Sequence, residues 1–585
     1  GGSSVSALGT AAFAFSAGTL QLRSEVATTF PHALTVSGNC ALSVDRITSA
    51  TGITLGISSL SIGGNTLTFS NGNSYVASIA GNLTLTGNAT LSTGMQVTLV
   101  GGIDDGGVAR TLTKTGSAAL ILTSSAVSCT GTLRVRVGTL ELRDPDAGGL
   151  TGNKATIQVV DQASGSATLN LYSNSDANFG NNIIFGGTAV ATQTCTFNIN
   201  RYSGSSTDCA ITVGSVTNNA STDINCTNQY DLRVSGTFTV AANTSTTPTM
   251  DLTAANVYID GPWVSNSSGT ITLPQSGKGT PLTSARQPGE LGLHFANGLS
   301  TSYPHGWASP ASPATHILIY AEEANTIVTA TGNHTGGNTA QSYRSGVVLR
   351  NGGTFVLNAA TWRKLASNGS PVQVAGNGTF RLASTFSGAY FGWSDNNANS
   401  AFDNTTLDKV GGVTLGGTTF ETTASGNFAL ASIAGSLNYN FTNEGASTWL
   451  VTTNAQTVAH NIVAANYALT IQADVDLTLS GVVSSDANAL IKTGTGTLTF
   501  SGSSANTKTG TLTINAGTVR LNKSGVNAWV GGLAVGDGTG TDTLIWDAAN
   551  QISDTAALTV NTGGRAELSG WSETVGNFNG AGTLA

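Results

Sequence analysis

Apolar and polar residues alternate with a period of two in short runs along most of the chain. Examples are Asn82–Thr86, Asp476–Leu479 and Thr497–Phe500. Successive side chains of a strand point to opposite faces, so this period indicates strands with one buried face. Gly, Asn and Ser separate the runs, and these residues favour turns. The pattern therefore predicts an all-β protein built from many short strands.

One local unit of sequence occurs twice. Lys114-Thr115-Gly116 is followed by Thr130–Leu133 and then Gly138-Thr139-Leu140, and Lys492-Thr493-Gly494 is followed by Thr509–Leu512 and then Gly517-Thr518-Val519. The lysine and the last glycine are separated by nearly the same length of chain in both copies, roughly 24 residues, which suits one coil of a parallel β-helix with three short strands and three turns. We therefore predict a parallel β-helix, a solenoid of roughly 24 residues per rung.

A longer duplication encloses these units. Ala77–Leu83 reappears as Ala431–Leu437, so the module at 60–142 is repeated in the second half. The second copy has gained about one local unit, which a solenoid tolerates because each unit contacts only its neighbours. We predict one β-helix segment over 1–273 and a second over 321–585.

The interval between these segments has a different composition. Six of the eleven prolines lie between Pro274 and Pro313. Four of the six histidines lie in or just after the same interval, and they are His294, His305, His316 and His334. Proline cannot donate to a β-ladder, so we predict that 274–320 is an excursion from the solenoid or a joint. This interval could serve as a passive spacer or as a functional loop, and the sequence leaves both alternatives open.

Composition and charge remove several other classes of protein. Only 9% of the residues are charged, whereas 39% are hydrophobic and 74 are glycine, which disfavours both amphipathic helices and disorder. No basic run is present, so we expect no nucleic-acid partner. No apolar run is long enough to span a membrane as a helix, so we expect no membrane-spanning helix.

The five cysteines occur in phase with neighbouring apolar residues. Cys195, for example, alternates with Phe197 and Ile199. This phase predicts buried thiols, and a disulfide among Cys195, Cys209 and Cys226 is left open. No CxxC spacing occurs, so no zinc site is expected.

Candidate catalytic and metal-binding residues are sparse. Glycoside cleavage needs two carboxylates, and Asp104–Asp105 is the best acidic pair, but it lies in the glycine-rich turn 101–107. The segment 536–542 is similar to a calcium-binding nonapeptide, but that motif works in tandem and here occurs once. We therefore predict no catalytic residue, no metal site and no cofactor, with Ca²⁺ as the one ion considered.

Aromatic residues offer one candidate binding surface. Trp307 and Trp393 lie in the middle third, where exposed rings would stack on sugars or on a partner protein. Core filling is the alternative for both. We keep them as the candidate ligand-binding residues.

The two lysine-containing units resemble the autotransporter-associated β-strand repeat, also called the passenger-associated transport repeat. The resemblance covers 112–142 and 490–521, and Gly532–Leu544 resembles the segment that often follows such repeats. It implies a right-handed parallel β-helix on a secreted bacterial surface protein.

Together these features predict a non-catalytic, secreted structural protein that forms or decorates an extracellular fibre or cell-surface layer. The chain begins within a repeat, and 580–585 looks like the opening of another. We therefore expect self-association of rods end to end. The alternatives are a glycan-binding adhesin passenger and a carbohydrate-active β-helix lyase or hydrolase.

Overall fold

The computed structural model of the chain describes most of the sequence. The described residues are 11–162, 164–187, 193–240, 250–265, 271–272, 292–298, 300–303, 307–308, 316–331, 334–335, 344–358, 361–363, 372–376, 378–382, 390–391, 412–416, 419–422, 438–458, 461–464, 467–484 and 486–585. They form two compact units, one over 1–274 and 288–293, and the other over 275–287 and 294–585.

Strands form where the period-two pattern predicts them. In β4 (Cys40–Asp45) the side chains of Cys40, Leu42 and Val44 are buried, and the other three are partly exposed. A strand with this pattern therefore contributes one row of apolar side chains to the interior and one row of partly exposed side chains to the surface. The described pairings between strands are parallel and join each rung to the next, as in β10–β13 and β13–β15.

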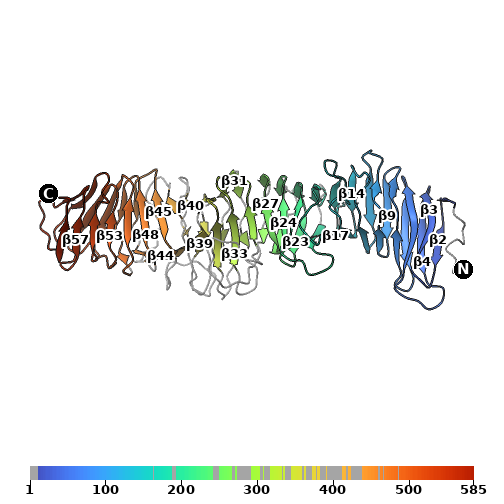
Figure 1. Cartoon of the computed structure of the whole chain (residues 1–585), viewed down its shortest axis with the longest axis horizontal. Helices are drawn as coiled ribbons and strands as arrows, with labels where there is room; N and C mark the ends of the chain where they lie inside the picture. The colour runs from blue at the N-terminus through green and yellow to red at the C-terminus, as the bar shows by residue number, and fades with distance from the viewer. Residues whose placement is uncertain are drawn as a thin grey trace. The chain divides into compact units, whose positions relative to one another are not determined.

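The first unit has two long faces and, from β18 onward, a third. In Figure 1 the strands of this unit run from blue at β2 to green at β27. One face contains β1 (Phe13–Phe15), β3 (Thr28–Val36), β5 (Thr54–Ile62), β7 (Val76–Ile79), β10 (Val97–Leu99), β13 (Ala119–Leu122), β15 (Gly138–Leu142), β17 (Gly165–Tyr172), β20 (Gln193–Asn200), β23 (Ser221–Cys226), β26 (Met250–Ala254) and β29 (Ile271–Thr272), with β8 (Leu83–Leu85) and β11 (Ile103–Asp104) branching from β5. The second contains β2 (Thr19–Arg23), β4, β6 (Thr66–Asn71), β9 (Ala89–Thr93), β12 (Thr111–Thr115), β14 (Thr132–Val135), β16 (Thr156–Val159), β19 (Ile183–Phe185), β22 (Val216–Asn218), β25 (Phe238–Val240) and β28 (Trp263–Ser265). The third contains β18 (Ala177–Asn178), β21 (Ala210–Val213), β24 (Asp231–Val234) and β27 (Asn256–Ile259).

The second unit is built in the same way. One face contains β30 (Gly292–Phe295, from His294 onward), β33 (His316–Ala321), β36 (Arg344–Leu349), β39 (Val372–Gly376), β42 (Gly412–Gly416), β44 (Asn438–Gly445), β47 (Asn461–Val463) and β50 (Val483–Ser484). The next contains β31 (Ser300–Tyr303), β34 (Ile327–Ala330), β37 (Thr354–Leu357), β40 (Thr379–Leu382), β43 (Thr419–Thr422), β45 (Ser447–Val451), β48 (Leu469–Ala473), β51 (Leu490–Thr493), β53 (Leu512–Ile514), β55 (Leu533–Val535), β57 (Ala557–Val560) and β59 (Asn577–Gly580). The remaining strands are β32 (Trp307–Ala308), the sheet β35 (His334–Thr335), β38 (Thr361–Arg363) and β41 (Tyr390–Phe391), and the sheet β46 (Gln456–Val458), β49 (Leu477–Leu479), β52 (Thr497–Gly502), β54 (Thr518–Lys523), β56 (Asp542–Trp546), β58 (Gly564–Glu567) and β60 (Thr583–Leu584).

The register between strands shows how long each rung is. Leu112 of β12 pairs with Leu133 of β14, whereas Ile183 of β19 pairs with Val216 of β22, so the second of these rungs contains more chain than the first. Rungs therefore differ in the length of their loops while their strands keep the same stacking. The predicted parallel β-helix with about 24 residues per rung is confirmed.

The structure shows the state of the five cysteines and the described parts of the interval 274–320. All five cysteines are free thiols, four of them buried, and Cys209 is partly exposed. The interval 274–320 contains β31 and β33, which pair in parallel with β34 and β36, so its described parts carry ladder strands. Its six prolines, and the repeated segment 431–437, lie outside the described residues.

Among the residues that the structure describes, no helix is long and apolar enough to cross a membrane.

Candidate functional site

The shared pattern of the two repeat units places a lysine ammonium group inside the solenoid. Lys114 lies near the end of β12, on the same face as Leu112, and its side chain is fully enclosed. Its Nζ donates to the carbonyl oxygens of Thr115 at 3.1 Å, Gly116 at 2.6 Å and Val137 at 2.8 Å. Val137 belongs to the next rung, so one ammonium group ties two rungs together.

The second repeat unit builds the same arrangement. Lys492 of β51 is also enclosed, and its Nζ donates to Thr493 at 2.7 Å, Gly494 at 2.7 Å and Ala516 at 3.0 Å. We call each set of three carbonyls with its ammonium group a lysine cradle. Two cradles with the same chemistry in separate units show that the lysine of the motif is structural.

The glycines of the motif are required by the geometry of the cradle. Gly116 and Gly138 have φ of +79° and +75°, which disfavours any residue with a side chain. A Cβ at Gly138 would also lie 2.5 Å from the Gly116 carbonyl oxygen and 2.7 Å from Lys114 Nζ. Gly494 and Gly517 repeat these conformations in the second cradle. The motif Lys-x-Gly…Gly therefore encodes one cradle.

Burial also decides the chemistry that the lysines can perform. It lowers the pKa of Lys114 and of Lys492 to about 8, so both remain mainly ammonium ions at neutral pH. An ammonium ion has three N–H donors and no acceptor, and here all three donors are used. The cradle can fasten rungs together but presents no free amine to a substrate.

A related buried ammonium group occurs further along the second unit. Lys523 lies at the end of β54, and its Nζ donates to Gly481 at 2.9 Å and to Ser501 at 2.8 Å. These carbonyls lie on the two preceding rungs, so Lys523 connects three rungs. Burial lowers the pKa of Lys523 to about 8 as well.

Asp105, the acid considered as a catalytic candidate, is a buried residue in a turn of the first unit. Its carboxylate accepts from Ser128 Oγ at 2.6 Å, from the backbone N–H and hydroxyl of Thr130 at 2.6 and 2.9 Å, and from the Gly107 N–H at 3.0 Å. Burial raises the pKa of Asp105, but these hydrogen bonds outweigh burial and hold it below its usual value. Asp104 accepts from the Gly106 N–H within the same turn. The turn interpretation therefore agrees with the geometry of the pair.

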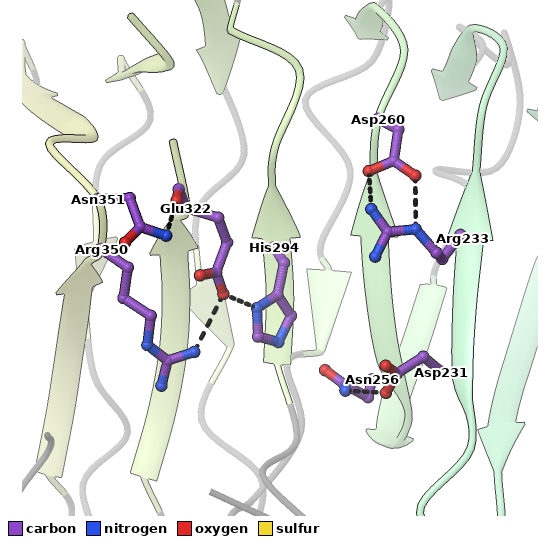
Figure 2. Close-up of polar contacts among 8 residues, drawn as sticks. All are labelled: Asp231, Arg233, Asn256, Asp260, His294, Glu322, Arg350 and Asn351. Carbon is purple, nitrogen blue, oxygen red and sulfur yellow. Dashed lines mark hydrogen bonds and ion pairs between the residues drawn. The ribbon is translucent and has the colours of Figure 1, made fainter. Parts of the chain in front are cut away.

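A second buried polar group lies on successive rungs of the second unit (Figure 2). His294 lies in β30, Glu322 directly follows β33 and Arg350 directly follows β36. Glu322 and Arg350 occupy matching positions of neighbouring rungs, whereas His294 is in register with Tyr320, two residues before Glu322. One Glu322 carboxylate oxygen contacts His294 Nδ1 and lies 3.1 Å from Arg350 Nη1. Sequence reasoning singled out His294 but not its two partners, because only the length of these rungs brings the three residues together.

The first unit has two polar pairs on and beside its third face (Figure 2). Arg233 donates two hydrogen bonds to Asp260, at 2.9 and 2.6 Å, and Asn256 donates to the buried Asp231 carboxylate. The two-bond pattern between neighbouring rungs also occurs in Arg136 with Asp161 and in Arg520 with Asp547. These pairs neutralise charge across rungs.

The tryptophans proposed to bind a ligand are not tested by these contacts. The backbone of Trp307 forms β32, its side chain is not among the described ones, and Trp393 lies outside the described residues. Ligand binding by both stays a prediction. Trp263, in contrast, is buried in the first unit and stacks on Phe238 with ring centroids 4.9 Å apart.

In segment 536–542, which is similar to a calcium-binding nonapeptide, the Asp537 carboxylate is hydrogen-bonded within the segment itself. Asp537 accepts from the N–H of Thr539 at 2.8 Å and from its hydroxyl at 2.7 Å, as in an ordinary Asp turn. Within the part of the chain that the structure describes, no three His, Cys, Asp or Glu side chains gather to hold a metal ion.

Comparison with known proteins identifies the unit that carries the lysine cradle. The passenger-associated transport repeat matches residues 112–142 and 490–521. These are the two segments that contain Lys114 and Lys492, so the resemblance seen in the sequence is confirmed. No curated protein and no solved structure gave a match.

Proposed function

We propose, from the premise that the chain contains two passenger-associated transport repeats, that it is part of a non-catalytic passenger displayed outside a bacterial cell. In this role the chain is a scaffold: a stack of rungs that keeps its shape in the extracellular medium and holds its loops away from the membrane. The repeat description is that of secreted passengers, which supports an extracellular location.

The observation that carries this proposal is the lysine cradle. Each matched repeat is an integral rung, joined to its neighbours by backbone ladders and by a buried ammonium group that bridges to the next rung. Both the motif lysine and the motif glycines are used in this link. The two segments that match the repeat, 112–142 and 490–521, therefore hold neighbouring rungs together.

Surface display tests the proposal directly. The chain would be fused between a secretion signal and the membrane-anchoring domain of an autotransporter, and intact cells would be treated with protease. We expect the chain to be reachable at the surface and to yield large resistant fragments. A Lys114→Met, Lys492→Met variant is the matched control, and we expect it to give smaller fragments. A chain that is retained inside the cell, or is digested completely, would contradict the proposal.

The proposal extends to association between copies into fibres. Rungs stack through backbone hydrogen bonds, which depend little on side-chain identity, so the rungs of two copies could pair as rungs within one copy do. Sedimentation velocity across a concentration series, with electron microscopy of the same samples, tests this. We expect the sedimentation coefficient to increase with protein concentration as copies associate. A single monomeric species at every concentration would contradict association into fibres and would leave surface display as the proposed function.

A further inference from the structure

We propose that the Glu322 carboxylate, held between His294 and Arg350, is an acid-sensitive clasp that keeps the rungs of β30, β33 and β36 together. When Glu322 loses its charge, these rungs open locally while the rest of the solenoid stays folded. The device is separate from the scaffold role and needs no ligand.

The clasp joins residues of three successive rungs. Arg350 N–H donates to the Ala321 carbonyl at 2.8 Å, so Arg350 is in register with Glu322. Glu322 N–H donates to the Phe295 carbonyl, which places His294 in register with Tyr320, so the His294 side chain reaches Glu322 diagonally across the two rungs. The single carboxylate contacts His294 on one side and Arg350 on the other. Asn351 also donates to the Glu322 backbone carbonyl at 3.0 Å. One anion therefore links both neighbouring rungs (Figure 2).

Aromatic packing shields the clasp from water. Tyr320 stacks on His294 with ring centroids 3.9 Å apart and planes 9° apart, and the Arg350 guanidinium lies 4.9 Å from the centre of the Tyr320 ring. His294 and Tyr320 are fully buried, and Arg350 is 3% exposed. Tyr320 also packs in a buried cluster with Val348 of the next strand. Charges in such a setting interact strongly and cannot be compensated by solvent.

The charges of the clasp determine whether acid or base opens it. Arg350 is charged at every accessible pH, and Glu322 holds a negative charge against it. Among the described residues, the titratable and charged groups that face this carboxylate are His294 from β30, Tyr320 from its own strand and Arg350 from β36. Protonation of Glu322 would remove the negative charge beside a buried guanidinium, which is strongly destabilising.

The pKa of Glu322 fixes where this loss begins. Burial raises the pKa, but the hydrogen bond from His294 and the charges of His294 and Arg350 outweigh burial and hold it below its usual value. A carboxyl with a lowered pKa in the folded state contributes stability that is complete above its unfolded value. That contribution is lost as the pH falls through the folded value. The clasp is therefore closed at neutral pH and opens on acidification.

Hydrogen–deuterium exchange of the full chain, measured by mass spectrometry from about pH 7 to about pH 3, tests the proposal. Protection factors would be corrected for the intrinsic exchange rate at each pH. We expect peptides from 316–331 and 344–358 to lose protection by up to about tenfold per pH unit once Glu322 titrates. Peptides from 490–524 serve as the internal reference, and we expect them to keep their protection.

A paired substitution separates the clasp from general acid unfolding. The Glu322→Gln, Arg350→Met variant removes both charges, so we expect near wild-type protection at neutral pH and no selective acid loss in 316–331 and 344–358. Glu322→Gln alone removes the negative charge beside the arginine, so we expect these peptides to be poorly protected already at neutral pH. Equal acid loss in the wild type and the paired variant, or no acid loss in the wild type, would overturn the proposal.

Discussion

At the scale of the residue, buried polar side chains in this protein act as fasteners between rungs. Lys114 and Lys492 each satisfy three carbonyl oxygens, and Asp105 satisfies four donors. Such groups are tolerated inside a protein because every donor or acceptor has a partner. Each fastener joins residues that are about one rung apart in the sequence.

Replacement of a cradle lysine tests this role. We expect Lys492→Met to destabilise its rungs by about 2–4 kcal/mol, because three buried carbonyls lose their donor. Arg565→Met is the control, since Arg565 is a partly exposed cation whose ion pair with Glu567 lies at the surface. We expect the control to change stability by about 0.5 kcal/mol or less. Urea unfolding of the two variants gives the comparison, and equal effects would contradict the cradle.

The Asp105 corner gives a prediction with a sign in pH. Its pKa lies below its usual value in the folded chain, so its stabilising effect is complete above the unfolded value and fades as the pH falls through the folded pKa. We expect Asp105→Asn to cost about 2–3 kcal/mol at neutral pH, because the amide replaces one acceptor oxygen with donors. Unfolding measured from about pH 6 to about pH 2 should show a smaller acid-dependent loss in the variant. Parallel pH profiles would exclude Asp105 as a titrating fastener.

At the scale of the element, short strands and tight corners set the path of the chain. The strands were predictable because Cys40, Leu42 and Val44, or Cys195, Phe197 and Ile199, alternate with polar residues and are indeed buried. Many corners pass within contact distance of the rung below. At Gly131, an added Cβ would lie 2.0 Å from the Arg110 carbonyl oxygen, whereas at Gly64 it would meet no atom within 4 Å.

These two glycines make a matched pair for mutation. We expect Gly131→Ala to cost about 3 kcal/mol or more, because a carbonyl of the neighbouring rung must move. Gly64→Ala should be neutral or stabilising by about 0.4–1 kcal/mol, because alanine restricts the unfolded chain. Thermal unfolding of both variants decides the matter. A similar loss in both would mean that close rung packing is not the reason for glycine at position 131.

At the scale of the whole molecule, the sequence repeats made the fold predictable, but they gave no sign of the buried group of His294, Glu322 and Arg350. Recurrence of Lys-Thr-Gly and Gly-Thr once per local unit led to a parallel β-helix, which is confirmed. The partners of His294 could not be found in this way, because Glu322 and Arg350 lie on longer rungs and belong to no repeated motif. The lysines were visible as part of the motif, but their role required the register of the following rung.

The rung register itself is tested most directly by pairs of cysteines introduced into a chain whose five native cysteines are replaced. Thr478 of β49 pairs with Thr499 of β52, and Thr499 pairs with Arg520 of β54. Adjacent strands are about 4.8 Å apart, so Thr478→Cys with Thr499→Cys lies within the reach of a disulfide. Thr478→Cys with Arg520→Cys spans two rungs, about 10 Å, and lies beyond that reach. We predict rapid oxidation of the first pair and none within a chain for the second; oxidation of the second pair in preference to the first would contradict the stacking of rungs described here.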